Sequence, residues 1–328
     1  MNSSVVTTQT LSVTLAFLAT ASALLAEEPP RARALLTPGD VEDSFDFETE
    51  QIEGTIRLEG KYHGVTRLVD RRTGTQVIDS RYSALNLFKL MSVNQVMGQP
   101  RVMPRTTKAG KDWVETTWGA TDGHKAEIKA RYEVMQPDAV ELTLTVRSHG
   151  AYRGYEVFLS NYFDKSFTPH VPLWSRGRRK SELVVPTFSP VFEGTVLVFP
   201  RDAHAARLCV DGRWERNEFS TPTVQMAPVR YYSQCMAFMT DLENRLGVVL
   251  MSRPRDCYAI SSRYHSEKES ERLTTYSAFD LSLFGNNFIA KDERTVKVRL
   301  TLTDLDEQLS QPSKLYRAFL DETNPKRP

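Results

Sequence analysis

The chain has 328 residues, 40% of them hydrophobic, and its 42 lysine and arginine residues nearly balance its 41 aspartate and glutamate residues. The hydrophobic share is enough for a folded core and argues against a wholly disordered chain. A formal net charge of +1 argues against a general nucleic-acid-binding protein, which needs a basic excess to neutralise phosphates.

The first 26 residues have the features of an export signal. Leu11 to Ala26 is a mildly apolar run that ends in small residues, and it is shorter than the roughly 20 apolar residues that a membrane span requires. Residues 1–10 contain no lysine or arginine, so an uncleaved anchor and an ordinary N-terminal segment stay open as alternatives. We predict a signal peptide over 1–26, a linker over 27–45, and export to the periplasm or the extracellular space.

The most regular pattern lies between His124 and Phe163. Ala126 to Val134 alternates apolar and polar side chains, a proline-containing turn follows, and Val140 to Val146 alternates again. Tyr155 to Phe163 is apolar on both faces, which is typical of a strand covered on both sides. The pattern predicts a meander of two amphipathic strands and one buried strand.

No break in amino-acid composition marks a domain boundary within residues 46–305. Strand-like segments separated by turn residues predict about 15 strands. No long amphipathic helix separates them, which disfavours a parallel α/β sheet. We therefore predict one all-β domain, a large antiparallel sandwich over 46–305. Residues 306–328 follow as a C-terminal helix and tail, with the helix over Gln311 to Thr323.

Three stretches resemble the galactose mutarotase-like superfamily of aldose 1-epimerases. Residues 54–78 are similar to its opening strands, residues 124–146 to its central strands, and residues 276–302 to its closing strands. The resemblance implies a two-sheet β-supersandwich with a sugar-binding concave face.

The catalytic motif of the aldose 1-epimerases is incomplete in this chain. The resemblance leads us to look for Asn-His-x-Tyr-Phe-Asn, whose histidine is an acid/base at the sugar ring oxygen. The nearest match, Ser160 to Asp164, keeps the Tyr-Phe pair and lacks the histidine. No partner glutamate is evident near the C-terminus, so standard mutarotase chemistry is not expected.

A stretch rich in aromatic and basic residues, Asp164 to Pro190, suggests a carbohydrate site. Sugar sites combine aromatic platforms with polar and charged groups, and arginine pairs bidentately with a uronate carboxylate. The predicted acid/base residues are His170 and His265, because histidine titrates near neutrality. The predicted substrate-binding residues are Tyr162, Asp164, Trp174, Arg176, Arg230, Tyr232 and Arg263. The competing interpretation is a surface loop whose aromatic residues close the edge of the sandwich.

Two functions follow from these observations. The first is an exported carbohydrate-binding protein whose ligand is a sugar or an acidic polysaccharide. The alternative is a carbohydrate-active enzyme with an altered acid/base site, either an epimerase-like sugar isomerase or a polysaccharide lyase. We expect no cofactor and no metal, since neither CxxC nor HExxH occurs.

Three cysteines, Cys209, Cys235 and Cys257, leave at least one thiol without a disulfide. Cys235 and Cys257 occupy consecutive strand-like segments, so a cross-strand disulfide is geometrically feasible. The favoured interpretation is that all three are small buried hydrophobic residues.

Overall fold

The computed structural model describes residues 31–324, except 94, 176, 188–193, 210–222, 227–229, 264, 267, 269 and 271–273. The chain divides into two units, residues 1–31 and residues 32–328, and the fold below is that of the second unit. The predicted signal peptide, the first residues of the linker and Arg176 therefore lie outside the described residues.

The strands that the structure describes form three sheets. In spatial order, the largest contains β14 (Ser181–Val184), β13 (Thr168–Trp174), β17 (Met236–Asp241), β18 (Leu246–Ser252), β21 (Glu293–Asp304), β11 (Ala139–Ser148), β10 (Ala126–Met135), β9 (Trp113–Trp118) and β8 (Thr106–Ala109). The second contains β16 (Thr223–Met226), β15 (Gly194–Pro200), β19 (Cys257–Arg263), β20 (Ser277–Phe288), β12 (Tyr152–Phe163), β6 (Asn86–Ser92) and β7 (Gln95–Gly98). The third contains β1 (Leu36–Pro38), β2 (Ser44–Glu48), β3 (Ile52–Arg57), β4 (Gly64–Asp70) and β5 (Thr75–Gln76).

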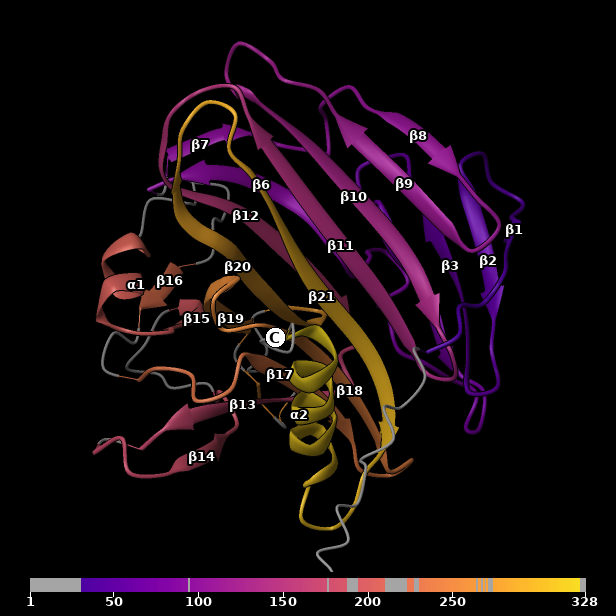
Figure 1. Cartoon of the computed structure of the whole chain (residues 1–328). Helices are drawn as coiled ribbons and strands as arrows, with labels where there is room; N and C mark the ends of the chain where they lie inside the picture. The colour runs from indigo at the N-terminus through magenta and orange to yellow at the C-terminus, as the bar shows by residue number, and fades with distance from the viewer. Residues whose placement is uncertain are drawn as a thin grey trace, which may run out of the picture. The chain divides into compact units, whose positions relative to one another are not determined.

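The nine-stranded and seven-stranded sheets share one hydrophobic core (Figure 1). Leu142 and Leu144 of β11 contribute to it from one sheet, and Val157 and Leu159 of β12 from the other. Among the described strands, β15 and β16 pair in parallel and all other pairs are antiparallel. The predicted fold class, an all-β sandwich, is confirmed. The five-stranded sheet adds to its two large sheets, and its β1 lies within the stretch predicted as a linker.

The predicted meander is correct for its first two strands and wrong for the third. β10 pairs with β11 from Ala126 opposite Ser148 to Met135 opposite Ala139, as their alternation predicts. β12 instead pairs with β20 and β6 in the other sheet. It is buried on both faces from Gly154 onward, as its sequence predicts. Alternation reports which face of a strand is buried, but it does not report which strand lies beside it.

Within the described ranges, two helices accompany the sheets. The short α1 (Ala203–Leu208) lies next to β15 and β19, and α2 (Gln311–Thr323) spans the segment predicted as a C-terminal helix. α2 packs against β18 and β21, as Figure 1 shows. Its Tyr316 hydroxyl accepts a hydrogen bond from the Cys235 backbone N–H at 3.1 Å. Among the described residues, no helix has the length and apolarity needed to cross a membrane.

The cysteines are buried, as expected for small hydrophobic residues. Cys209, Cys235 and Cys257 are all buried, and Cys235 and Cys257 are free thiols. Burial raises the pKa of the Cys257 thiol well above its usual value.

Candidate functional site

The two histidines predicted as acid/base residues lie on and beside β13. His170 is buried, its Nε2 lies 3.0 Å from Thr240 Oγ1, and its ring stacks on Phe238 at a centroid distance of 5.0 Å. Burial lowers the pKa of His170 to about 4, which keeps the ring neutral at neutral pH. His265 Nε2 lies 3.4 Å from Thr168 Oγ1. Packing and threonine contacts account for the position of His170 without a substrate.

Most of the predicted binding residues make local structural contacts. Asp164 Oδ1 accepts hydrogen bonds from the backbone N–H and the hydroxyl of Ser166, which closes a turn. The Tyr232 hydroxyl is buried and donates to the Cys257 carbonyl. Of the remaining predicted residues, Trp174 is half-buried at the end of β13, and Arg230 pairs with Glu182 at 3.6 Å.

The structure does bring two of the predicted residues, Tyr162 and Arg263, into one group. We call this group the tyrosine–arginine cluster, and its members are Tyr62, Tyr82, Tyr162, Tyr276, Arg101, Arg263 and Asp280. They come from β12, β19 and β20 and from segments next to β4, β6, β7 and β20. Tyr62, Tyr82 and Tyr276 are half-buried, whereas the other four residues are buried.

The tyrosine rings of the cluster are in mutual contact. The Tyr82 ring centroid lies 4.8 Å from that of Tyr162, 5.1 Å from that of Tyr276 and 5.0 Å from that of Tyr62. Tyr162 and Tyr276 are 5.0 Å apart in an edge-to-face arrangement. We call the three half-buried rings, Tyr62, Tyr82 and Tyr276, the rim of the cluster, and its buried side chains the floor.

Strand register explains why the floor is polar. Ser160 on β12 stands opposite Asp280 on β20, which stands opposite Ser261 on β19. Opposite residues share a face of the sheet, and so do residues two positions apart along a strand. Tyr162 and Arg263 are therefore on the same face as Asp280.

The floor contains a buried ion pair. Arg263 Nη1 lies 3.0 Å from Asp280 Oδ2, and the two side chains are 4% and 0% exposed. Burial raises the pKa of Asp280, although the charge of Arg263 opposes this effect. Three buried polar atoms here lack a well-formed hydrogen bond: Arg263 Nε, Asp280 Oδ1 and Ser160 Oγ. Buried polar atoms usually have partners, so three unsatisfied atoms in one group are unusual. The Ser160 side chain lies close enough to Asp280 to act against the effect of burial on the pKa of Asp280.

Arg101 forms the other side of the floor. Its Nε donates to Asn86 Oδ1 at 3.0 Å, and its Nη2 donates to the Tyr162 hydroxyl at 3.2 Å. The guanidinium carbon lies 4.0 Å from the centre of the Phe88 ring and 4.7 Å from that of Tyr62, within the range of cation–π attraction.

A buried hydrogen-bond network holds Asn86, and therefore Arg101, in place. The backbone carbonyl of His63 accepts hydrogen bonds from Ser83 Oγ and from Asn86 Nδ2, both at 2.8 Å. Leu85, the preceding residue, has a left-handed backbone with φ of 54°. Its N–H donates to Asn161 Oδ1 at 2.7 Å, and its carbonyl accepts from the Tyr132 hydroxyl at 3.0 Å. A buried leucine keeps this costly conformation only where its surroundings enforce it, and such sites are often functional.

Ser160 stands where the epimerase motif would place its histidine. In the pattern Asn-His-x-Tyr-Phe-Asn the histidine is two residues before the tyrosine, which corresponds to Ser160 before Tyr162. The side chain at this position faces the cluster, because it lies opposite Asp280. The nearest match to the motif thus lies on β12, the strand that carries Tyr162 of the cluster, and it lacks the acid/base histidine.

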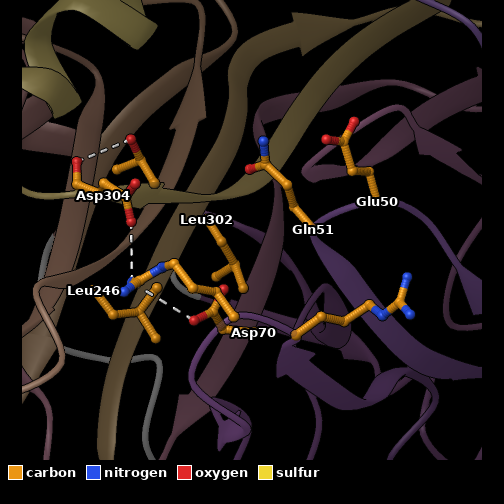
Figure 2. Close-up of a pocket in the computed structure, with 9 residues that line it drawn as sticks. Glu50, Gln51, Asp70, Leu246, Leu302 and Asp304 are labelled. Atoms are coloured by element: carbon orange, nitrogen blue, oxygen red, sulfur yellow. Dashed lines mark hydrogen bonds and ion pairs between the residues drawn. The ribbon is translucent and has the colours of Figure 1, made fainter.

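Two surface pockets share no residue with the cluster. One, of about 380 Å³, is lined by residues that include Gln51, Asp70, Arg72 and Asp304, and Figure 2 shows it. Its Arg72 pairs with Asp304 at 3.0 Å and with Asp70 at 3.7 Å. The other, of about 350 Å³, contains Arg253, which is ion-paired with Asp256. The paired charges in both pockets indicate structural contacts.

Sequence reasoning missed five of the seven cluster residues, namely Tyr62, Tyr82, Arg101, Tyr276 and Asp280. They are spread over more than 200 positions and form no linear motif. The only local signal is Asp280, a carboxylate within the otherwise apolar start of β20.

No protein-family model matches this chain, and no curated protein matches its sequence. Solved structures similar to it include a galactose 1-epimerase from Lactobacillus acidophilus NCFM, with 8% identity, a TM-score of 0.44, and coverage of 83% of this chain and 99% of that chain. A putative aldose 1-epimerase from Escherichia coli K12 has 9% identity, a TM-score of 0.45, and coverage of 79% and 98%. A heparan sulfate lyase mutant from Pedobacter heparinus has 6% identity, a TM-score of 0.44, and coverage of 83% and 37%.

The predicted resemblance is confirmed, because the similar solved structures include a galactose 1-epimerase and a putative aldose 1-epimerase.

Proposed function

We propose that the protein binds a carbohydrate at the tyrosine–arginine cluster. The observation that carries the proposal is the half-exposed rim of Tyr62, Tyr82 and Tyr276 above a floor with unsatisfied polar atoms. Aromatic rings bind the apolar faces of sugar rings, and a few placed polar groups bind the sugar hydroxyls. The hydroxyl groups of the three half-buried tyrosines can each donate and accept such hydrogen bonds.

Export of the protein belongs to the same proposal. Residues 1–26 have the composition of a signal peptide, and an exported carbohydrate-binding protein meets its ligand outside the cytoplasm. The acidic polysaccharide predicted as a ligand is compatible with the two arginines of the cluster, because guanidinium groups pair with carboxylates.

A second function, catalysis on the bound sugar, has one observation in its favour. The pKa of Asp280 is raised by burial, and a carboxyl group with a raised pKa is suited to acid/base chemistry. Its ion pair with Arg263 and the serine at position 160 favour binding over turnover.

A glycan array with the full-length protein tests the proposal. We expect Tyr82→Ala and Tyr276→Ala each to reduce binding about fivefold or more, because each removes an aromatic ring whose stacking contributes roughly 1 to 3 kcal/mol. Tyr231→Ala is the matched control, since Tyr231 is a half-buried tyrosine beside Arg178 in the region where the sequence placed the site.

Three results decide between the functions. Loss of binding only in the Tyr231 variant would move the site to the β13 region, and no binding to any glycan would end the proposal. Ultraviolet absorbance of unsaturated products from an acidic glycan would replace binding with lyase activity.

A further inference from the structure

Arg101 differs from the other arginine side chains that are less than a tenth exposed. The ion pairs of those other side chains are Arg263–Asp280 (3.0 Å), Arg299–Glu141 (2.8 Å) and Arg105–Glu59 (3.6 Å). Arg101 is 7% exposed, and no acidic side chain among the described residues lies within ion-pair distance of it. It is a buried cation whose hydrogen bonds are all to neutral groups.

Burying a charge without a counter-charge is costly, and a buried charge is normally paired. The amide of Asn86 and the hydroxyl of Tyr162 are neutral acceptors that only partly replace water. An anion that reaches the guanidinium would recover the missing attraction. A bound anion would therefore supply the ion pair that Arg101 lacks among the described residues.

The guanidinium has one nitrogen left for a ligand. Nε and Nη2 donate to Asn86 and Tyr162, which fixes the orientation of the planar group. Nη1 donates to no described residue, and it is absent from the buried atoms that lack partners, so it keeps contact with solvent. The free nitrogen is beside the rim, because the guanidinium lies 4.7 Å from the Tyr62 ring centre.

The charges around the rim favour an anion as well. Asp280 and Asp79 are paired with Arg263 and Arg81, respectively. Lys61 Nζ lies 5.7 Å from the Tyr62 ring centre and adds a positive charge at the rim. Asp280 also interacts electrostatically with Arg101, so two arginines share one carboxylate. With Lys61, the group keeps an excess of positive charge.

We propose that the carbohydrate is an anionic saccharide and that Arg101 binds its carboxylate or sulfate group. This inference rests on the proposed function, because it concerns the same site. Arg101 is then the residue that determines specificity, and the tyrosine rim supplies binding common to neutral and acidic sugars. The proposal uses only the fixed guanidinium and requires no chemical step.

The test compares matched saccharides by isothermal titration calorimetry on the full-length protein. The first pair is an oligogalacturonate and its methyl ester, and the second is a sulfated glycosaminoglycan oligosaccharide and its desulfated form. We expect the wild type to bind one acidic member about ten- to a hundredfold more tightly than its neutral counterpart, as for a charge-assisted hydrogen bond. The two pairs distinguish a carboxylate from a sulfate ligand.

The decisive variant is Arg101→Gln, and the readout is the ratio of the two dissociation constants within a pair. This ratio is expected to fall to near one, and it is insensitive to a general loss of affinity. Arg317→Gln is the control, because Arg317 is an exposed arginine on α2 and should keep the wild-type ratio. Thermal unfolding of both variants checks that each is folded.

Each outcome bears on one of the two proposals. A wild type that binds acidic and neutral members equally would overturn the role of Arg101 and leave carbohydrate binding intact. Unchanged discrimination in Arg101→Gln would do the same. If the wild type binds no saccharide, carbohydrate binding itself is wrong and the inference fails with it.

Discussion

Arg263 and Asp280 place two opposite charges out of contact with water beneath the tyrosine rim. The attraction between buried charges roughly offsets their loss of hydration, so such a pair stabilises little relative to apolar residues. Removing one partner is different, because it leaves the other charge buried alone. At the scale of single residues, the stability lost when one partner is removed therefore tests whether the two charges are buried.

We expect Asp280→Asn to lower the free energy of unfolding by about 3 to 5 kcal/mol, the range for a broken buried pair. Urea denaturation followed by circular dichroism measures the change. Asp304→Asn is the control, because Asp304 pairs with Arg72 at a side-chain exposure of 74% and should cost less than about 1 kcal/mol. Equal effects of the two substitutions would contradict a buried, unhydrated pair.

At the scale of elements, α2 is tied to the nine-stranded sheet through Arg299. This side chain lies on β21 and pairs with Glu141 of β11 at 2.8 Å and with Glu322 of α2 at 2.7 Å. Lys297 also pairs with Glu141. Burial acts to raise the pKa of the Glu141 carboxyl, but the charges of Lys297 and Arg299 lower it overall. Glu141 is thus expected to stay ionised.

Glu141→Gln should destabilise the fold by about 3 kcal/mol or more, since it leaves Arg299 with one partner in a buried setting. Glu322→Gln should cost less, because that carboxyl is 39% exposed and water can replace it. Urea midpoints of the two variants give the comparison. A larger loss of stability in Glu322→Gln than in Glu141→Gln would mean that the Arg299–Glu322 pair, which attaches α2, stabilises the fold more than the buried Arg299–Glu141 pair.

Strands were predictable where a single face is buried, as in β10 and β11, because alternation follows from one wet and one dry face. The partner of β12 was not predictable from its sequence. An apolar run such as Tyr155 to Phe163 fits the interior of either sheet, and the choice was made by contacts with β6 and β20, which are distant in sequence. The seven residues of the cluster meet for the same reason, so only Tyr162 and Arg263 could be named beforehand.

At the scale of the whole molecule, three buried histidines make stability depend on pH. Burial lowers the pKa of His124 and His170 to about 4, and it lowers the pKa of His63 well below 6.5. In the unfolded chain all three would titrate near 6.5. The unfolded state then binds more protons than the folded state between these values, so stability is complete above about pH 6.5 and falls as the pH drops toward 4.

The size of this effect is about 1.4 kcal/mol for each unit of pKa difference. We expect the urea midpoint to fall between pH 7.5 and pH 5, and to fall less in His124→Gln and in His170→Gln than in the wild type. His149→Gln is the control, because this histidine is exposed. A wild-type midpoint that stays constant over this range would show that the three rings accept protons in the folded state.

The position of Leu85 between the two sheets affects how firmly Arg101 is oriented toward a ligand. The amide of Leu85 is held by Asn161 in one sheet and its carbonyl by Tyr132 in the other, and its neighbour Asn86 holds Arg101. The spacing between the two sheets is thereby transmitted to a guanidinium whose contacts Asn86, Phe88 and Tyr162 all lie in the seven-stranded sheet. A small shear of one layer against the other, from heat or from a distant core substitution, would turn the arginine away from the tyrosine rim before any strand separates. Discrimination between saccharides would therefore fade at temperatures where the sandwich is still intact.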